Sequence, residues 1–69
     1  MVEYRNNVTI TQDEMKQIVT KHGYKVGGGS YETDNAIYVE SYEVQSGTMG
    51  ASKMCVHYNK ATKQLMIAN

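Results

Sequence analysis

The apolar and polar residues between Ile10 and Tyr24 follow the period of an α-helix. Apolar side chains recur there at intervals of three and four residues, and polar side chains fill the positions between them. This narrow stripe consists of Met15, Ile18, Val19 and His22. We therefore expect an amphipathic helix, from about Gln12 to His22, that covers one side of another element.

Both ends of this helix carry a sequence signal. Thr11 is a suitable N-cap, and Glu14 three residues later completes a capping box, in which each side chain accepts a hydrogen bond from the other residue's backbone N–H. Gly23 stands where a left-handed residue commonly follows the last turn, and Tyr24 can fold back over Val19. The boundaries of the helix are therefore the best specified in the chain.

Alternating residues predict strands on either side of the helix. The first strand is expected from Val2 to Thr9, with a bend or bulge at Asn6-Asn7. Alternation along it places three apolar side chains on one face: Tyr4, Val8 and Ile10.

The most strand-like segment is Ala36–Val44, which is rich in β-branched and aromatic residues. We expect it to be the central strand. With a period of two, one face carries Ile37, Val39 and Ser41 and meets the helix. The other face points outward and carries Tyr38, Glu40 and Tyr42.

Four consecutive residues, Gly27-Gly28-Gly29-Ser30, precede this strand and are expected to form a flexible connection. A phosphate-binding loop would lead into the N-terminus of a helix. Because these glycines lead toward a strand, they do not fit a phosphate site.

The last third of the chain predicts a loop and then a hairpin. The loop is expected from Gln45 to Ser52 and contains one large apolar residue, Met49. The hairpin consists of Lys53–Tyr58, a turn at Asn59–Lys63, and Gln64–Ala68. The whole chain, residues 1–69, is therefore predicted to be a single α+β domain in the order β-α-β-β-β. Its antiparallel sheet would have three or four strands, with one helix on one face.

The composition indicates a small core. Val, Ile, Leu and Phe together number 12 of 69 residues, while there are five Met and six Tyr. A domain of this size is only marginally stabilised by one core, and Met and Tyr are residues that serve interfaces well. We therefore expect a homodimer, and the segment Gln64–Asn69 is expected to be the sheet edge that pairs with its copy.

Charge and cysteine content narrow the function classes. Seven acidic and seven basic residues give a net charge of zero, which argues against a polyanion as the main partner. Cys55 is the one cysteine, so an intrachain disulfide is excluded and a reducing cytoplasm is expected. No long apolar run predicts a membrane span, and no basic and apolar leader predicts secretion.

No set of residues predicts catalysis or metal binding. Cys55 and His57 share one side of a strand, and His22 ends the helix, but no paired metal-ligand spacing is present. No third group is evident to orient a Cys-His nucleophile pair. Glu40 and Glu43 fall on opposite faces of their strand, which excludes a paired acid and base there. The chain is expected to have no catalytic residue, no metal and no cofactor.

The distribution of charge is the most informative functional feature. Residues 27–50 contain four acids and no base, whereas residues 51–69 contain three lysines and no acid. One interpretation is that neighbouring strands of opposite charge pair across the sheet. The other is an acidic, aromatic partner-binding surface that suits a basic protein. Its residues would be Tyr31, Tyr38, Glu40, Tyr42 and the loop residue Met49.

One family shares part of this pattern. The order of elements in this part of the chain is a helix, His22-Gly23-Tyr24, a glycine-serine loop and a strand. This order is similar to that in small RNA-cleaving toxins of toxin and antitoxin modules. Those toxins carry a catalytic histidine just after the glycine-serine step, where this chain has Tyr31-Glu32. The family is therefore not assigned.

Two functions follow from these observations. The first is a non-enzymatic protein-binding module, of the kind that phages and mobile elements use to inhibit a host protein such as a nucleic-acid-binding machine. The less favoured alternative is a nucleic-acid-binding regulator whose tyrosines stack on bases. Its phosphate contacts would come from Arg5, Lys53, Lys60 and Lys63.

Overall fold

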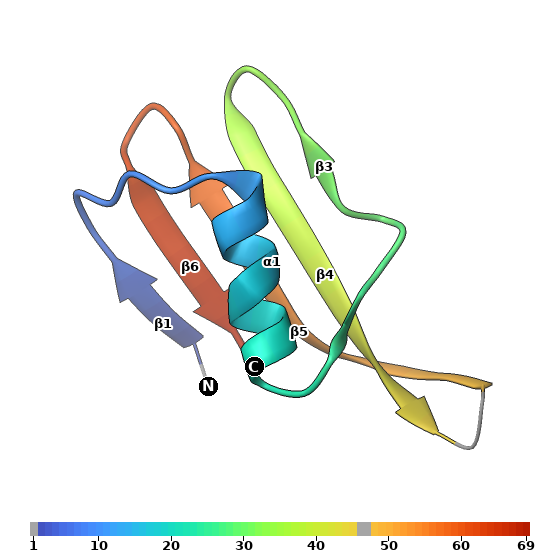
Figure 1. Ribbon diagram of the computed structural model, residues 1–69. Helices are drawn as coiled ribbons and strands as arrows, with labels where there is room; N and C mark the ends of the chain where they lie inside the picture. Colours follow the sequence, from blue (N-terminus) through green and yellow to red (C-terminus); the bar gives the residue numbers. More distant parts are fainter. Residues whose placement is uncertain (1, 46–47) are drawn as a thin grey trace.

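One helix packs on one face of an antiparallel sheet (Figure 1). The computed structural model describes residues 2–45 and 48–69, and the side chains among them outside residues 44–53. The helix is α1 (Gln12–Lys21). Within the described residues the sheet has six strands: β1 (Val2–Arg5), β2 (Lys25–Val26), β3 (Tyr31–Glu32), β4 (Ala36–Gln45), β5 (Thr48–Asn59) and β6 (Gln64–Ala68).

The strand order is β1-β6-β5-β4-β2, and β3 also pairs with β4. The α+β class with one helix is confirmed, but the prediction of three or four strands is wrong. Both β2 and β3 are two residues long, which is too short to show a period of two in the sequence. They lie one after the other along the side of β4 that β5 leaves free.

The ends of α1 have the geometry that the sequence predicts. The Glu14 N–H donates to Thr11 Oγ1 at 3.2 Å, and the Thr11 N–H donates to Glu14 Oε1 at 3.1 Å, so the capping box is complete. At the other end Gly23 has a φ of +86°. The N–H groups of Gly23 and Tyr24 donate to the carbonyls of Thr20 and Val19, which is the Schellman pattern. The helix is therefore fixed at both ends by local bonds.

Replacement of Thr11 by alanine should lower the free energy of unfolding by about 1 kcal/mol, because the helix loses its N-cap acceptor. Denaturant unfolding followed by circular dichroism would measure the change. Thr20→Ala is the matched control, since Thr20 is exposed in the helix and its hydroxyl only bonds back to the Gln17 carbonyl. Equal midpoints for Thr11→Ala and the wild type would contradict the capping role.

The core lies between α1 and three strands of the sheet, β4, β5 and β6. Met15 and Val19 from the helix are fully buried against side chains of β4, β5 and β6. The predicted inward face of β4 is confirmed, because its three members are at most 2% exposed. The other buried strand residues are Met54, Val56, Tyr58, Leu65 and Ile67. In the described part of the chain, no helix has the length and apolar character that crossing a membrane requires.

The N-terminal segment differs from its prediction. β1 ends at Arg5, and Asn7 has a φ of +56°. This left-handed residue turns the chain, so Val8 and Ile10 pack against the core, whereas Tyr4 is 58% exposed on the opposite face of the sheet. The prediction that these three side chains share one face is therefore wrong.

The strand expected at the edge of the sheet lies inside it. β6 pairs with β5 on one side and with β1 on the other, with Val2 opposite Ala68 and Arg5 opposite Leu65. The prediction of a free edge at Gln64–Asn69 is wrong, because β1 supplies the neighbour that the sequence pattern did not indicate.

The predicted loop from Gln45 to Ser52 is also largely strand. β4 continues to Gln45 and β5 begins at Thr48, with Val44 opposite Met49. Glycine and serine in this segment favour a loop by composition, but its described residues, Gln45 and those from Thr48 onward, belong to the paired strands.

β4 and β5 lose their regular register at two points. Between the pairs Glu40–Cys55 and Tyr42–Ser52, β4 has one residue and β5 has two, which is the count of a β-bulge. The one residue on β4 is Ser41, which is 2% exposed. Its Oγ donates to the Met54 carbonyl at 2.7 Å and accepts the Met54 N–H at 2.9 Å. A side-chain hydroxyl therefore pairs backbone groups at the bulge.

Candidate functional site

The face of the sheet opposite α1 is not covered by any element of the described chain (Figure 1). Directly opposed residues of antiparallel strands point to the same side of a sheet, so the strand register identifies which residues share this face. One line of opposed residues crosses all the paired strands from β3 to β1. We call it the open-face row, and it consists of Tyr31, Tyr38, His57, Met66 and Tyr4.

The open-face row is accessible along its length and most exposed at its two ends. Tyr31 is 48% exposed and Tyr4 is 58% exposed, while the three residues between them are half-buried. The rings of Tyr31 and Tyr38 contact each other, with centroids 5.4 Å apart and planes inclined by 32°. Aromatic pairs in this tilted arrangement present a preformed apolar surface with hydroxyl groups at its rim.

The surroundings of Tyr38 disfavour ionisation of its phenol. Partial burial raises the pKa of Tyr38 above its usual value, and the nearby Cys55 and Glu40 side chains raise the pKa further. Like any tyrosine phenol at neutral pH it is protonated, and it can both donate and accept a hydrogen bond.

A second line of residues lies beside the open-face row on the same side of the sheet. The register places Glu40 opposite Cys55, Cys55 opposite Ala68, and Ala68 opposite Val2. Val2 is 52% exposed. These two lines are therefore mainly apolar and aromatic, and Glu40 is the carboxylate among them.

The glycine segment folds around that carboxylate. Gly29 donates its N–H to Glu40 Oε1 at 2.8 Å, and Gly27 donates its N–H to the Glu40 carbonyl at 2.8 Å. Ser30 Oγ accepts the Glu40 N–H at 3.2 Å and donates to the Gly27 carbonyl at 2.9 Å. The expectation of a flexible connection is wrong, because these residues form a bonded bulge between β2 and β3.

Four of the five predicted partner-binding residues come to one face. Tyr31, Tyr38 and Glu40 belong to the two lines described above, and Tyr42 on the same face of β4 lies opposite Lys25. The side chain of Met49 lies outside the described residues. The binding role of these side chains remains a prediction, and their shared location agrees with it.

The basic residues of the nucleic-acid alternative do not gather on this face. Arg5 lies opposite Leu65, on the helix side of the sheet, and forms an ion pair with Glu3. Lys63 lies in the turn between β5 and β6, with a φ of +56°. The side chain of Lys53 is outside the described residues.

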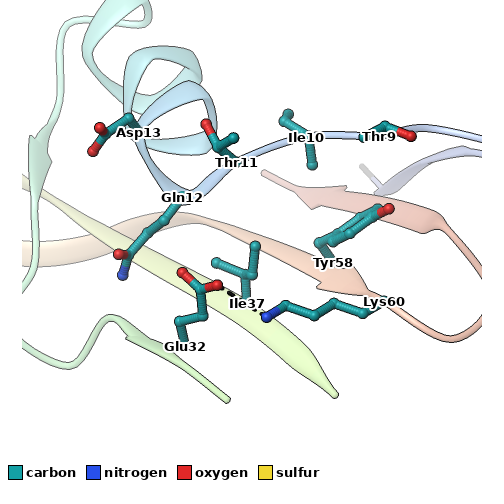
Figure 2. Close-up of a pocket in the computed structure, with 9 residues that line it drawn as sticks. All are labelled: Thr9, Ile10, Thr11, Gln12, Asp13, Glu32, Ile37, Tyr58 and Lys60. Atoms are coloured by element: carbon teal, nitrogen blue, oxygen red, sulfur yellow. Dashed lines mark hydrogen bonds and ion pairs between the residues drawn. The ribbon is translucent and has the colours of Figure 1, made fainter. Parts of the chain in front are cut away.

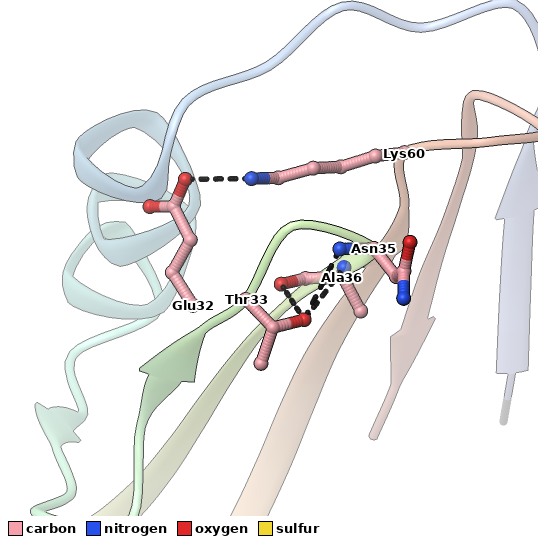
Figure 3. Close-up of polar contacts among 5 residues, drawn as sticks. All are labelled: Glu32, Thr33, Asn35, Ala36 and Lys60. Carbon is pink, nitrogen blue, oxygen red and sulfur yellow. Dashed lines mark hydrogen bonds and ion pairs between the residues drawn. The ribbon is translucent and has the colours of Figure 1, made fainter.

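Lys60 is also paired with a carboxylate. Its Nζ lies 2.9 Å from Glu32 Oε2 (Figure 3). The Lys60 N–H donates to the Asn35 carbonyl at 2.9 Å, and Thr33 Oγ1 accepts N–H bonds from Asn35 and Ala36, which order this corner. The Glu32–Lys60 pair joins an acid and a lysine from the two oppositely charged parts of the chain, but it does not lie across neighbouring strands, because Glu32 belongs to β3 and Lys60 to the turn after β5.

A groove of about 500 Å³ lies at the N-terminal end of α1, on the helix side of the sheet (Figure 2). The Glu32–Lys60 ion pair lies along its wall, and Gln12 and Asp13 line the helix end. Thr11 and Glu14 already satisfy N–H groups at this helix end. Among the described residues, no group of three histidine, cysteine or acidic side chains could hold a metal ion.

Sequence reasoning missed three members of the open-face row: Tyr4, His57 and Met66. His57 and Met66 stand at outward positions of a period-two pattern, whereas alternation places Tyr4 on one face with Val8 and Ile10. The alignment of all three depends on the register between strands that are distant in sequence. Comparison of this chain with protein-family models, with curated proteins and with solved structures found no match, so the site is interpreted from its geometry.

Proposed function

We propose that this chain is a non-enzymatic protein-binding module that binds its partner with the open face of its sheet. The observation that carries the proposal is the open-face row, which aligns three tyrosines, a histidine and a methionine across the sheet. Tyrosine and methionine are enriched in the buried centres of protein interfaces, and tyrosine is frequent among the residues that dominate binding energy.

The charges favour a protein over a nucleic acid. A polymer laid on this face would need basic side chains near its phosphates, yet Arg5 is on the other face and is paired with Glu3, and Lys60 is paired with Glu32. The register places Lys25 and Glu40 on the open face. A protein surface with apolar anchors and a few polar groups matches this mixture better than a phosphate backbone does.

A basic partner is part of the proposal. The Glu40 carboxylate is already oriented by the Gly29 N–H through one oxygen, and a carboxylate can accept several hydrogen bonds. An arginine or lysine of the partner could therefore bind Glu40 at little ordering cost. The inhibition of a host protein by a phage or mobile-element product is the biological setting that we propose for such a module, and the cytoplasm is its proposed location.

The test compares capture of proteins from a cell lysate by immobilised wild type and by Tyr38→Ala. Tyr38 lies inside the open-face row, so its removal should weaken a true partner by about tenfold or more. Gln17→Ala is the control, because Gln17 is exposed on the helix, away from this face. A protein that Tyr38→Ala loses and Gln17→Ala retains is then purified for measurement of its Kd with each variant.

Two further measurements separate the alternatives. Glu40→Gln keeps an acceptor for the Gly29 N–H but removes the charge, so it should slow association with a basic partner, mainly at low salt. Titration of labelled single-stranded DNA and RNA tests the nucleic-acid function, since phosphate-driven affinity falls steeply with salt. Tight, salt-sensitive binding of either polymer, or a partner that all variants bind equally, would contradict the proposal.

A further inference from the structure

The two edges of the sheet are built differently. One edge is formed by β2 and β3 and is interrupted by the bulge around Glu40. The other edge is β1, which pairs with β6 on its inner side, and no element of the described chain covers its outer side (Figure 1). Natural sheets usually protect such an edge with a bulge, a proline or an inward-pointing charge. The strand Val2–Arg5 contains neither a proline nor a bulge, and its two charged residues, Glu3 and Arg5, lie on the helix side of the sheet and pair with each other.

The exposed apolar side chains concentrate at this edge. In the described part of the chain, three large hydrophobic residues are strongly exposed, and two of them are Val2 and Tyr4 of β1, at 52% and 58%. Tyr4 is also the last member of the open-face row. The open-face row therefore ends at β1, the edge strand whose outer backbone N–H and C=O groups pair with no other strand of the described chain.

The sequence of β1 is complementary to itself when two copies run antiparallel. A two-fold axis perpendicular to the sheet keeps both helices on the same side of the joined sheet. Opposed residues of the two β1 strands must then point to the same side, which requires the axis to pass through a residue and not between two residues. An axis at Glu3 would place Glu3 opposite its own copy, and an axis at Arg5 would do the same for Arg5. An axis at Tyr4 instead places each Glu3 opposite the other copy's Arg5.

We propose that two copies of this chain associate through their β1 edges, with the two-fold axis at Tyr4. The two sheets then form one continuous sheet, stabilised by main-chain hydrogen bonds, by two cross-strand Glu–Arg pairs and by a Tyr4–Tyr4 contact. The open-face row of one copy continues into that of the other. This proposal is separate from the proposed binding of a protein partner. A monomer that still binds a partner with its open face would refute the dimer and leave the proposed function standing.

Charge reversal and charge exchange test this register. The dimer dissociation constant is measured by sedimentation over a concentration series for the wild type, Glu3→Arg, and Glu3→Arg with Arg5→Glu. Glu3→Arg sets arginines opposite each other and should raise the dissociation constant about tenfold or more. The exchanged pair restores opposite charges across the axis and should return the constant toward the wild-type value.

Asp13→Arg is the matched control, because it changes the net charge equally at an exposed position on the helix. It should leave the dissociation constant nearly unchanged, and circular dichroism confirms folding of every variant. A wild-type protein that stays monomeric at all concentrations overturns the proposal. So does a dimer that Glu3→Arg leaves intact, or one that the charge exchange fails to restore.

Discussion

Ser41→Ala is expected to lower the free energy of unfolding by about 2–3 kcal/mol, because two buried backbone groups lose their hydrogen-bond partner. Ser41 Oγ both accepts the Met54 N–H and donates to the Met54 carbonyl, and the serine is 2% exposed. Water cannot readily replace the hydroxyl at such a position. Stabilities of whole domains are of order 5–15 kcal/mol, so this loss would be a large share for so small a chain.

Denaturant unfolding gives the energy, and hydrogen exchange at the Met54 amide gives the local cause. In Ser41→Ala the Met54 amide should exchange faster than the rate expected from the lowered global stability of the variant alone. Ser30→Ala is the comparison, since Ser30 Oγ accepts the Glu40 N–H in a similar way but is only half-buried. Ser30→Ala is expected to lower the free energy of unfolding less than Ser41→Ala does. An unchanged midpoint and unchanged Met54 protection in Ser41→Ala would show that the hydroxyl is dispensable.

Gly27→Ala is expected to destabilise the fold by about 1–3 kcal/mol through overpacking. A Cβ at Gly27 would lie 2.6 Å from Glu40 Cγ and 2.7 Å from Glu40 Oε1. Because Cγ is close to the backbone, rotation of the carboxylate alone cannot relieve this clash. The Glu40 side chain must change rotamer, which also breaks its bond from the Gly29 N–H.

Gly28→Ala is the matched control in the same segment. A Cβ at Gly28 would meet no atom within 4 Å, so this variant should be neutral or slightly stabilising, by at most about 1 kcal/mol, through the unfolded chain. Gly27→Ala should lower the free energy of unfolding less in a protein that already carries Glu40→Ala than in the wild type. The difference between the two losses measures the coupling between positions 27 and 40. Equal effects of Gly27→Ala and Gly28→Ala would contradict the fit of this segment around Glu40.

The parts of the fold that the sequence predicts well are those fixed by neighbouring residues. The capping box of Thr11 and Glu14 and the left-handed Gly23 involve contacts within a few positions, and they appear as expected. The two faces of β4 follow from its own alternation. The side of the chain on which Tyr4 lies depends on the turn at Asn7, which no periodic pattern indicates.

The candidate site was predictable in part for the same reason. Tyr38, Glu40 and Tyr42 share a strand, so their common face follows from alternation. His57 and Met66 join Tyr38 only through the registers of β4 with β5 and of β5 with β6. The serine and glycine contacts to Glu40 arise where regular pairing is interrupted. A sequence pattern that assumes unbroken strands cannot predict them.

The pairing of β1 with β6 also has a consequence for the order of folding. Val2 lies opposite Ala68, so this contact closes almost the whole chain into one loop, whereas α1 and the β5–β6 hairpin form from nearby residues. Loop closure costs entropy before any contact compensates for it. All four residues of β1 are exposed even when paired, so little burial rewards the closure. We therefore expect β1 to be the last strand to join the sheet and the first to leave it, and its departure would expose the edge of β6.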